Sequence, residues 1–207
     1  MNNLKEIIRY YISDEINNID INSINISLMV SKYAHQNQKR ENGELYFNHP
    51  YNLFKRYIEL LNINYSNINE DSIKLLNKYE IPFSGVLELA LLHDVIEDST
   101  LTIKDVKSIF EEANLIDYYN EYIELPLKLI THNKNESYDV YINKVLDNPI
   151  SSLVKMLDLE DNSRLFSLNS IIDTKIDRTK RYINYFNTIN NKYHFVEKIY
   201  EYRRNLN

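Results

Sequence analysis

Glycine, proline and cysteine are scarce in this chain, and each scarcity excludes a class of structure. The 207 residues include only 2 glycines and 4 prolines. These are too few for glycine-built phosphate loops, tight hairpins or the regularly spaced turns of an all-β protein. Cysteine is absent, which excludes disulfides, iron–sulfur clusters, thiolate zinc sites and cysteine nucleophiles. Helices are therefore favoured, and any metal must be held by nitrogen and oxygen.

The chain also lacks a long apolar run near its start. The sequence MNNLKEIIRYYISDEI places acids among apolar residues at helical spacing, unlike a secretory signal or a membrane span. We therefore expect a cytoplasmic protein with no membrane partner. A formal charge of -6 argues against nucleic-acid binding. Residues 171–207 hold eight Lys/Arg against four Asp/Glu, but such a stripe is typical of a solvated helix face.

Apolar residues make up 43% of the chain and recur at spacings of three and four almost throughout. This pattern predicts an all-α fold, a single domain over residues 1–207 with eight to ten helices and one hydrophobic core. The expected helices cover residues 3–17, 24–38, 49–62, 70–79, 84–98, 102–113, 116–130, 136–147, 150–168 and 174–204. Thr102 with Asp105 resembles a capping box, and Pro82 and Pro149 lie just before or at helix starts. The asparagine-rich residues 62–69 are expected to form a loop.

The strongest local signal is LALLHDVIEDST at residues 89–100, where an apolar half-helix runs into four ionisable residues. On a helix, His93 and Glu97 would share one face, and Asp94 and Asp98 the adjacent face. Adjacent histidine and aspartate offer one imidazole and one carboxylate to the same ion. This mixture suits Mn²⁺, Fe²⁺, Co²⁺ or Zn²⁺ rather than calcium.

Two further ligands are needed from elsewhere in the chain. His49 precedes Pro50 at an expected helix start, and Asp158 lies one turn before Asn162 in an otherwise apolar helix. Taken alone, His49 would be an ordinary hydrogen-bonded histidine and Asp158 an ordinary acid on a partly exposed face. Together with His93-Asp94 they predict a metal site. Four protein ligands on an ion that accepts six leave room for water and a phosphate oxygen, as metal-assisted hydrolysis requires.

These segments, in this order, resemble the HD superfamily of metal-dependent phosphohydrolases, and within it the hydrolase domain of RelA/SpoT proteins and the small alarmone hydrolases. The matching blocks are AHQNQKRENGELYFNHP from Ala34, LLHDVIEDST from Leu91, residues 129–131 with Tyr138 and Tyr141 following, and VKMLDLEDN from Val154. The resemblance covers residues 28–168. It leaves residues 170–207 as a C-terminal helical extension.

The resemblance implies an HD-type helical fold with a single Mn²⁺ bound by His49, His93, Asp94 and Asp158. It implies that Glu97 and Asp98 position or activate the attacking water, and that Arg40 and Asn162 contact a nucleotide substrate. In that family the 3′-diphosphate of (p)ppGpp is removed, so we expect a guanosine-3′,5′-bis(diphosphate) 3′-diphosphatase of the stringent response. Arg40 can offer a phosphate two donors, which lysine cannot, and Tyr46 is a candidate to stack on the base.

Three departures from the family pattern weaken the assignment of a particular substrate but do not change the predicted metal ligands. Glu41 stands where the stringent-response enzymes often carry a basic residue, which weakens the case for a highly charged polyphosphate. The sequence Leu157-Asp158-Leu159 replaces their usual Ala-Asp-Arg. The segment between His49 and His93 is longer, with the extra residues near 62–82, and we expect it to form a lid or pocket wall.

Other functions remain open. The same metal could serve another nucleotide, such as ppApp, NADPH, a 5′-nucleotide or a dNTP, although relatives of that kind often lack the acidic pair Glu97-Asp98. A nucleotide-binding regulator without turnover would be expected to lack a ligand or the acidic pair. About 40 residues follow the Asp158 block, so alarmone synthesis is not expected. The sequence leaves open the native metal, the base preference and whether the chain forms a homo-oligomer.

Overall fold

The computed structural model describes residues 22–63, 70–164 and 173–206, and within these ranges the chain is helical and contains no β-sheet. The predicted all-α fold is confirmed. An isolated antiparallel bridge joins Lys39 and Leu45. None of the helices in the described ranges is long and apolar enough to cross a membrane. The helix expected over residues 3–17 and most of the loop expected over 62–69 lie outside the described residues.

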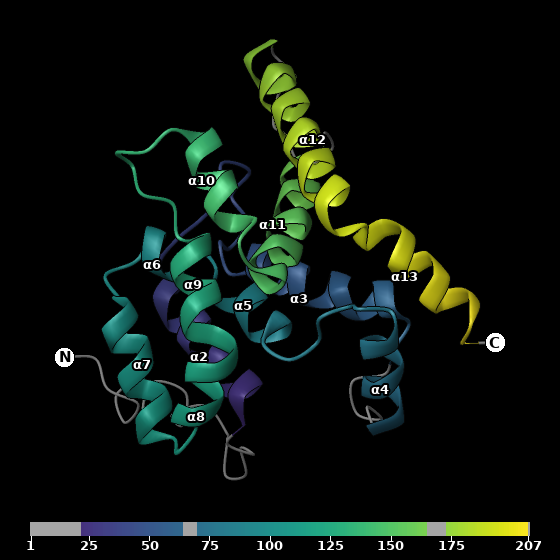
Figure 1. Ribbon diagram of the computed structural model, residues 1–207. Helices are drawn as coiled ribbons and strands as arrows, with labels where there is room; N and C mark the ends of the chain where they lie inside the picture. The colour runs from purple at the N-terminus through teal and green to yellow at the C-terminus, as the bar shows by residue number, and fades with distance from the viewer. Residues whose placement is uncertain (1–21, 64–69, 165–172, 207) are drawn as a thin grey trace.

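Helix α5 (Val86–Leu92) lies at the centre of the core, and every one of its residues is buried. A helix that is apolar on nearly all sides must be surrounded by other helices. Its main neighbours are α2 (Ser23–His35), α3 (Asn48–Leu61) and α11 (Pro149–Asn162) (Figure 1). This packing brings the start of α3, the end of α5 and the second half of α11 together.

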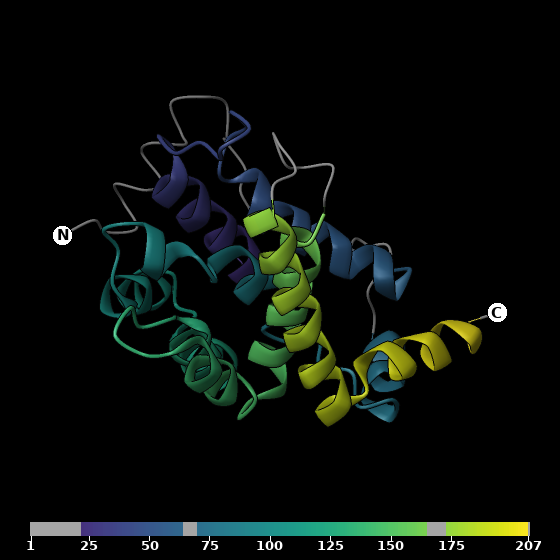
Figure 2. The same ribbon diagram turned by 90° about the horizontal axis from the view of Figure 1, so that it is seen from above.

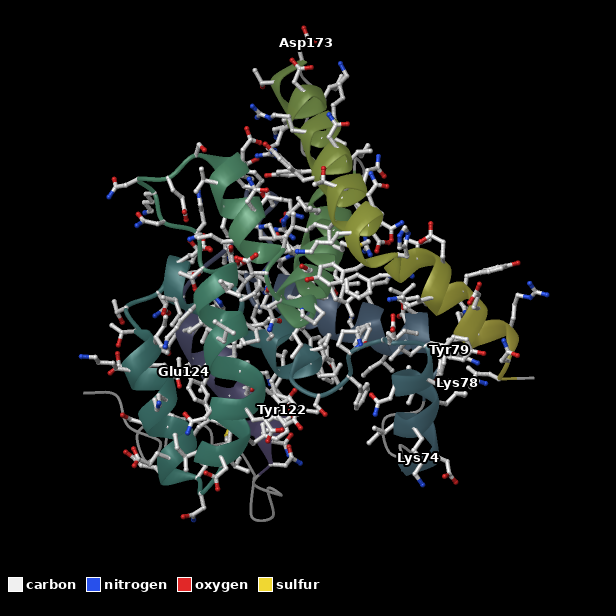
Figure 3. All side chains as sticks on the ribbon, in the orientation of Figure 1. Lys74, Lys78, Tyr79, Tyr122, Glu124 and Asp173 are labelled. Atoms are coloured by element: carbon white, nitrogen blue, oxygen red, sulfur yellow. The ribbon has the colours of Figure 1, made fainter. Side chains whose placement is uncertain are left out.

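The remaining helices flank this centre on two sides (Figure 1). On one side are α6 (Val95–Asp98), α7 (Ile103–Glu112), α8 (Ile116–Tyr118), the π-helical turn η2 (Tyr119–Ile123), α9 (Glu124–Ile130) and α10 (Tyr138–Val145). On the other are α4 (Glu70–Lys78), α12 (Asp173–Tyr193) and α13 (Phe195–Arg204). Helix α12 packs along α11, and its first residue, Asp173, lies at its outer end (Figure 3). Helix α13 leaves α12 at an angle and extends away from the core (Figure 2).

Most predicted helix starts agree with the local chemistry. Thr102 and Asp105 form the predicted capping box, in which each side chain accepts a hydrogen bond from the other residue's backbone N–H. Pro149 is the first residue of α11, and the Asn148 side chain caps that helix by accepting bonds from two backbone N–H groups. Proline is tolerated there because the N–H that it lacks would have no helical partner.

Three predicted helices are interrupted. The helix expected over 84–98 is broken by a turn at His93 and Asp94. The helix expected over 174–204 is two helices, because His194 adopts a left-handed conformation (φ 55°) between them. The helix expected over 116–130 contains the π-helical turn, just before Pro126, which has no N–H to donate to the preceding turn.

Candidate metal centre and adjoining cavity

His93 presents an unpaired nitrogen to the interior. Its ring is 2% exposed, and its Nδ1 lies 2.9 Å from the carbonyl oxygen of Ala90. A carbonyl oxygen only accepts, so Nδ1 carries a hydrogen, and in the neutral imidazole Nε2 then carries a lone pair. Nε2 is buried and makes no hydrogen bond, and Asp94 Oδ1 lies 3.2 Å from it. Ser31 Oγ and His35 Nε2 are also buried without a partner, so His93 Nε2 is a candidate binding position because of the ligand-type groups around it.

Three further donor groups surround this lone pair. Ligand atoms of His49, His93 and Asp94 lie within 4.8 Å of one another. From α11, Asp158 Oδ1 lies 3.1 Å from His49 Nε2 and 3.9 Å from His93 Nε2. The structure thus brings together all four residues predicted as metal ligands, from α3, α11 and the turn after α5. Two imidazoles and two carboxylates fit a divalent transition metal; that they bind one stays a prediction.

The second nitrogen of His49 fixes the orientation of its ring. Nδ1 donates to Asp161 Oδ2 at 2.7 Å, an arrangement common behind metal-binding histidines. Burial by itself would lower the pKa of His49, but the Asp158 and Asp161 carboxylates outweigh burial and raise that pKa to about 9. The electrostatic environment therefore favours a positive charge at this position.

Lys155, which was not predicted as a site residue, forms an ion pair with the carboxylate oxygen of Asp158 that does not face His49. It lies one helical turn before Asp158, and its Nζ donates to Asp158 Oδ2 at 2.7 Å. The ammonium also lies 5.0 Å from the ring centroid of Tyr141 and 5.6 Å from that of Tyr138. Burial would raise the pKa of Asp158, but the Lys155 ammonium and the His49 imidazole hold it well below its usual range. Asp158 therefore remains a carboxylate, and its Oδ1 faces the imidazole of His49.

The two predicted catalytic acids, Glu97 and Asp98, have different environments. Asp98 Oδ2 accepts from the Tyr46 hydroxyl at 2.6 Å, and the same hydroxyl lies 2.9 Å from Asp94 Oδ2. Glu97 Oε1 accepts from the backbone N–H of His132 at 2.6 Å. Burial raises the pKa of Glu97 to about 7, although the His132 N–H lowers it. Asp98 is thus linked to a predicted ligand, whereas Glu97 is tied to the turn after α9.

Tyr46 is partly exposed and contacts several protein groups. Its ring centroid lies 4.8 Å from that of the buried His35, and its hydroxyl bridges the two aspartates. His35 Nδ1 lies 2.8 Å from Gln38 Oε1, and the Gln38 amide donates to the carbonyl of Asp98. These contacts orient Tyr46 toward the acids. Its predicted stacking on a base stays a prediction.

A polar cavity of about 300 Å³ adjoins the cluster formed by His49, His93, Asp94 and Asp158. It is lined by Lys39, Arg40, Glu41, Asn42, Tyr46, Asn162, Arg178 and Tyr182. Arg40 Nη2 donates to Asn162 Oδ1 at 2.9 Å, and Asn162 Nδ2 donates to Asp158 Oδ1 at 2.5 Å. The two residues predicted to contact substrate therefore meet each other, and they connect the cavity to a predicted metal ligand.

The cavity keeps a positive character despite Glu41. Glu41 pairs with Lys175 of α12 at 3.1 Å, and this ammonium lowers the pKa of Glu41. Helix α12 also contributes Arg178, so three basic side chains and one acid line the cavity. Sequence reasoning missed Arg178 and Tyr182, because nothing in the local sequence shows that α12 would meet this loop. Lys155 and Asp161 did carry a signal, since ionisable residues at three-residue spacing flank Asp158 on an apolar helix.

The segment expected to form a lid does not line this cavity in the part that the structure describes. Between residues 70 and 82, Leu76 and Ile81 are buried in the core. Tyr79 packs edge-on against Tyr202 of α13, and Glu80 pairs with Lys198. The described part of the segment is therefore a support for α13.

No family model matches this chain, and no curated protein matches it. The resemblance to HD-superfamily phosphohydrolases consequently rests on the ordered sequence blocks alone and stays a prediction.

Proposed function

We propose that this protein is a divalent-metal-dependent phosphohydrolase of phosphorylated nucleotides, with a 3′-diphosphorylated guanosine nucleotide of the (p)ppGpp type as its first candidate substrate. The observation that carries the proposal is the buried, unpartnered lone pair of His93 Nε2, facing His49, Asp94 and Asp158. The Nε2 of the buried His35 also has no hydrogen-bond partner, so the support for a metal comes from the grouping of His93 with His49, Asp94 and Asp158.

The donor set fits Mn²⁺, held by His49, His93, Asp94 and Asp158. When bound, such an ion supplies Lewis acidity toward a phosphate oxygen and toward water. The chain's own groups would do the rest. Glu97, with a pKa of about 7, is suited to accept a proton from the attacking water at neutral pH. Asp98, held by the Tyr46 hydroxyl, would orient that water.

The adjoining cavity supports a phosphorylated substrate. Arg40 and Arg178 approach it from a loop and from α12, and Lys39 adds a third positive charge. Arginine can bind a phosphate through two parallel hydrogen bonds. Tyr46 and Tyr182 offer aromatic faces to a base, and this pairing of cations with aromatic rings favours a nucleotide over inorganic phosphate.

The test is release of pyrophosphate and orthophosphate from ppGpp, pppGpp, ppApp, NADPH, dNTPs and 5′-nucleotides, each with Mn²⁺ and with EDTA. We expect Mn²⁺-dependent pyrophosphate from the 3′-diphosphates. Orthophosphate from monophosphates alone would contradict the 3′-diphosphate substrate and retain the phosphohydrolase. No product from any nucleotide, with nucleotide binding retained, would contradict turnover and favour a regulator.

Variants distinguish site chemistry from a contaminating activity. His93→Ala should abolish Mn²⁺-dependent turnover, and Glu97→Gln should lower kcat by about a hundredfold or more, the usual contribution of a general base. Glu111→Gln is the matched control, because Glu111 is an exposed glutamate on α7 away from the cluster. Unchanged kcat in Glu97→Gln and Asp98→Asn would contradict the roles given to the acidic pair.

A further inference from the structure

A large cavity lies away from the predicted metal ligands. Its volume is about 630 Å³, within the range of roughly 300–1,000 Å³ that is common for small-molecule sites. Helix α11 separates it from the cluster. Lys155 and Asp158 face the cluster, whereas Met156 and Leu157 line the large cavity from the opposite face of the same helix.

The walls of this cavity are apolar. Helices α3, α11, α12 and α13 supply them, including Leu60, Phe186 and Ile199. Two other lining residues of α13, Val196 and Tyr200, are 48% and 63% exposed. Large apolar side chains exposed along one concave surface are typical of a binding site. The walls offer few hydrogen-bonding groups that could read a nucleotide base.

The polar residues of the cavity carry an excess of positive charge. Arg56, Arg203 and Arg204 line it together with one acid, Glu160. Arg56 neutralises that acid, because its Nε and Nη2 lie 3.1 and 2.8 Å from Glu160 Oε1. Arg204 lies over the ring of Tyr200, 5.9 Å from the centroid. Within the described ranges, neither Arg203 nor Arg204 forms an ion pair with a carboxylate.

We propose that this cavity binds a long-chain fatty acid. The apolar walls would bury the acyl chain, and the guanidinium groups of Arg203 and Arg204 would meet the carboxylate. Charge complementarity supports this class of ligand, since two unpaired arginines border an apolar cavity in a chain whose net charge is -6. The site does not use the predicted metal ligands, so the proposal stands apart from the phosphohydrolase function.

The experiment is a titration of the full chain with palmitate in EDTA. Binding is measured as displacement of a dansyl-labelled undecanoic acid from the protein. We expect saturable binding of one palmitate per chain. Arg203→Gln with Arg204→Gln should weaken binding at least tenfold, and Val196→Trp should weaken it similarly by filling the cavity. The uncharged hexadecanol should bind at least tenfold more weakly than palmitate. All three changed side chains are exposed, so these variants should fold.

The matched control is Lys180→Gln with Arg181→Gln, which removes the same charge from exposed positions of α12 outside the cavity. It should leave palmitate binding unchanged. Absence of saturable binding would overturn the proposal, as would equal affinity for palmitate and hexadecanol or unaltered affinity in the Arg203/Arg204 variant. Sedimentation velocity would show whether the chain forms a dimer. If Val196→Trp dissociated such a dimer and palmitate did not compete with it, the cavity would be the contact with a second copy, and the proposal would be overturned.

Discussion

The two carboxylate oxygens of Asp158 face different partners. Oδ2 accepts a hydrogen bond from the buried Lys155, whereas Oδ1 faces His49 and receives the amide of Asn162. By binding Oδ2, Lys155 orients the carboxylate so that Oδ1 is directed toward the imidazoles. Its ammonium also offsets a charge that would be unfavourable in the interior.

Replacing Lys155 by methionine should therefore destabilise the metal-free protein. Methionine keeps much of the length and apolar character of the side chain but leaves the Asp158 carboxylate without its cation. Removing one partner of a buried ion pair costs about 3–5 kcal/mol. The free energy of unfolding, measured with urea in EDTA, should fall by about that amount.

Two further variants separate this effect from a general loss of packing. Adding Asp158→Asn to Lys155→Met removes the unpaired charge, so the double variant should be more stable than Lys155→Met alone. Lys104→Met, at an exposed position of α7, should change stability by no more than about 0.5 kcal/mol. If Lys155→Met were as stable as the parent, Lys155 would not be the group that holds Asp158.

The residues predicted from the sequence differ from those that were missed in how local their signal is. His93 and Asp94 are adjacent, and His49 and Asp158 each lie in a short recognisable block, so pattern alone could propose that they meet. Arg178 gave no such signal, since its approach to Arg40 depends on how α12 packs. The lone pair of His93 Nε2 likewise required the position of the Ala90 carbonyl.

At the scale of elements, one buried acid joins three helices. Glu88 of α5 is 2% exposed, and its Oε1 accepts from Ser23 Oγ of α2 at 2.5 Å and from the Tyr118 hydroxyl of α8 at 3.0 Å. Burial raises the pKa of Glu88, although both hydroxyl donors oppose the rise. The folded state therefore keeps a proton on Glu88 to higher pH than the unfolded state does.

This difference gives the protein a measurable pH dependence. An acid whose pKa is raised by folding stabilises the fold fully below its unfolded pKa, about 4.3 for glutamate, and that stabilisation is lost as pH rises through the folded pKa. Glu88→Gln keeps an oxygen for both donors and has no charge to bury. Urea unfolding should show its stability relative to the parent rising with pH across that window and then levelling off.

Glu111→Gln controls for removal of an acid from the surface, and its difference from the parent should lack this rise. A difference between Glu88→Gln and the parent that stays flat from pH 4 to pH 8 would show that folding does not bind a proton at Glu88.

The sequence predicted where helices occur better than it predicted where a helix is interrupted. Apolar periodicity located the described helices, because the face toward the core repeats at each turn. It continues across His93-Asp94 and across His194, where the chain turns, so it could not show either interruption. The first interruption lies within the candidate site, and in the short helix after it Glu97 accepts a hydrogen bond from the backbone of His132.

At the scale of the whole molecule, α11 faces the predicted metal ligands on one side and the apolar cavity on the other, and α12 borders both cavities. Helix α12 packs along α11 and brings Lys175 and Arg178 to the loop that carries Arg40 (Figure 1). The ion pair between Lys175 and Glu41 is a direct link between α12 and that loop. Because the pair lies beside the polar cavity, it should influence substrate binding more than the chemical step.

Lys175→Glu should therefore raise KM for the phosphorylated substrate by about two- to fivefold, as expected for a partly exposed ion pair, with little change in kcat. The like charges at positions 41 and 175 would separate α12 from the loop and displace Arg178 from the cavity. Exchanging the charges in Glu41→Lys with Lys175→Glu should restore much of KM. Lys180→Glu, at an exposed position of the same helix, should leave KM unchanged. A lower kcat with unchanged KM in Lys175→Glu would contradict this account, because the pair would then act on the reacting groups and not on the position of α12.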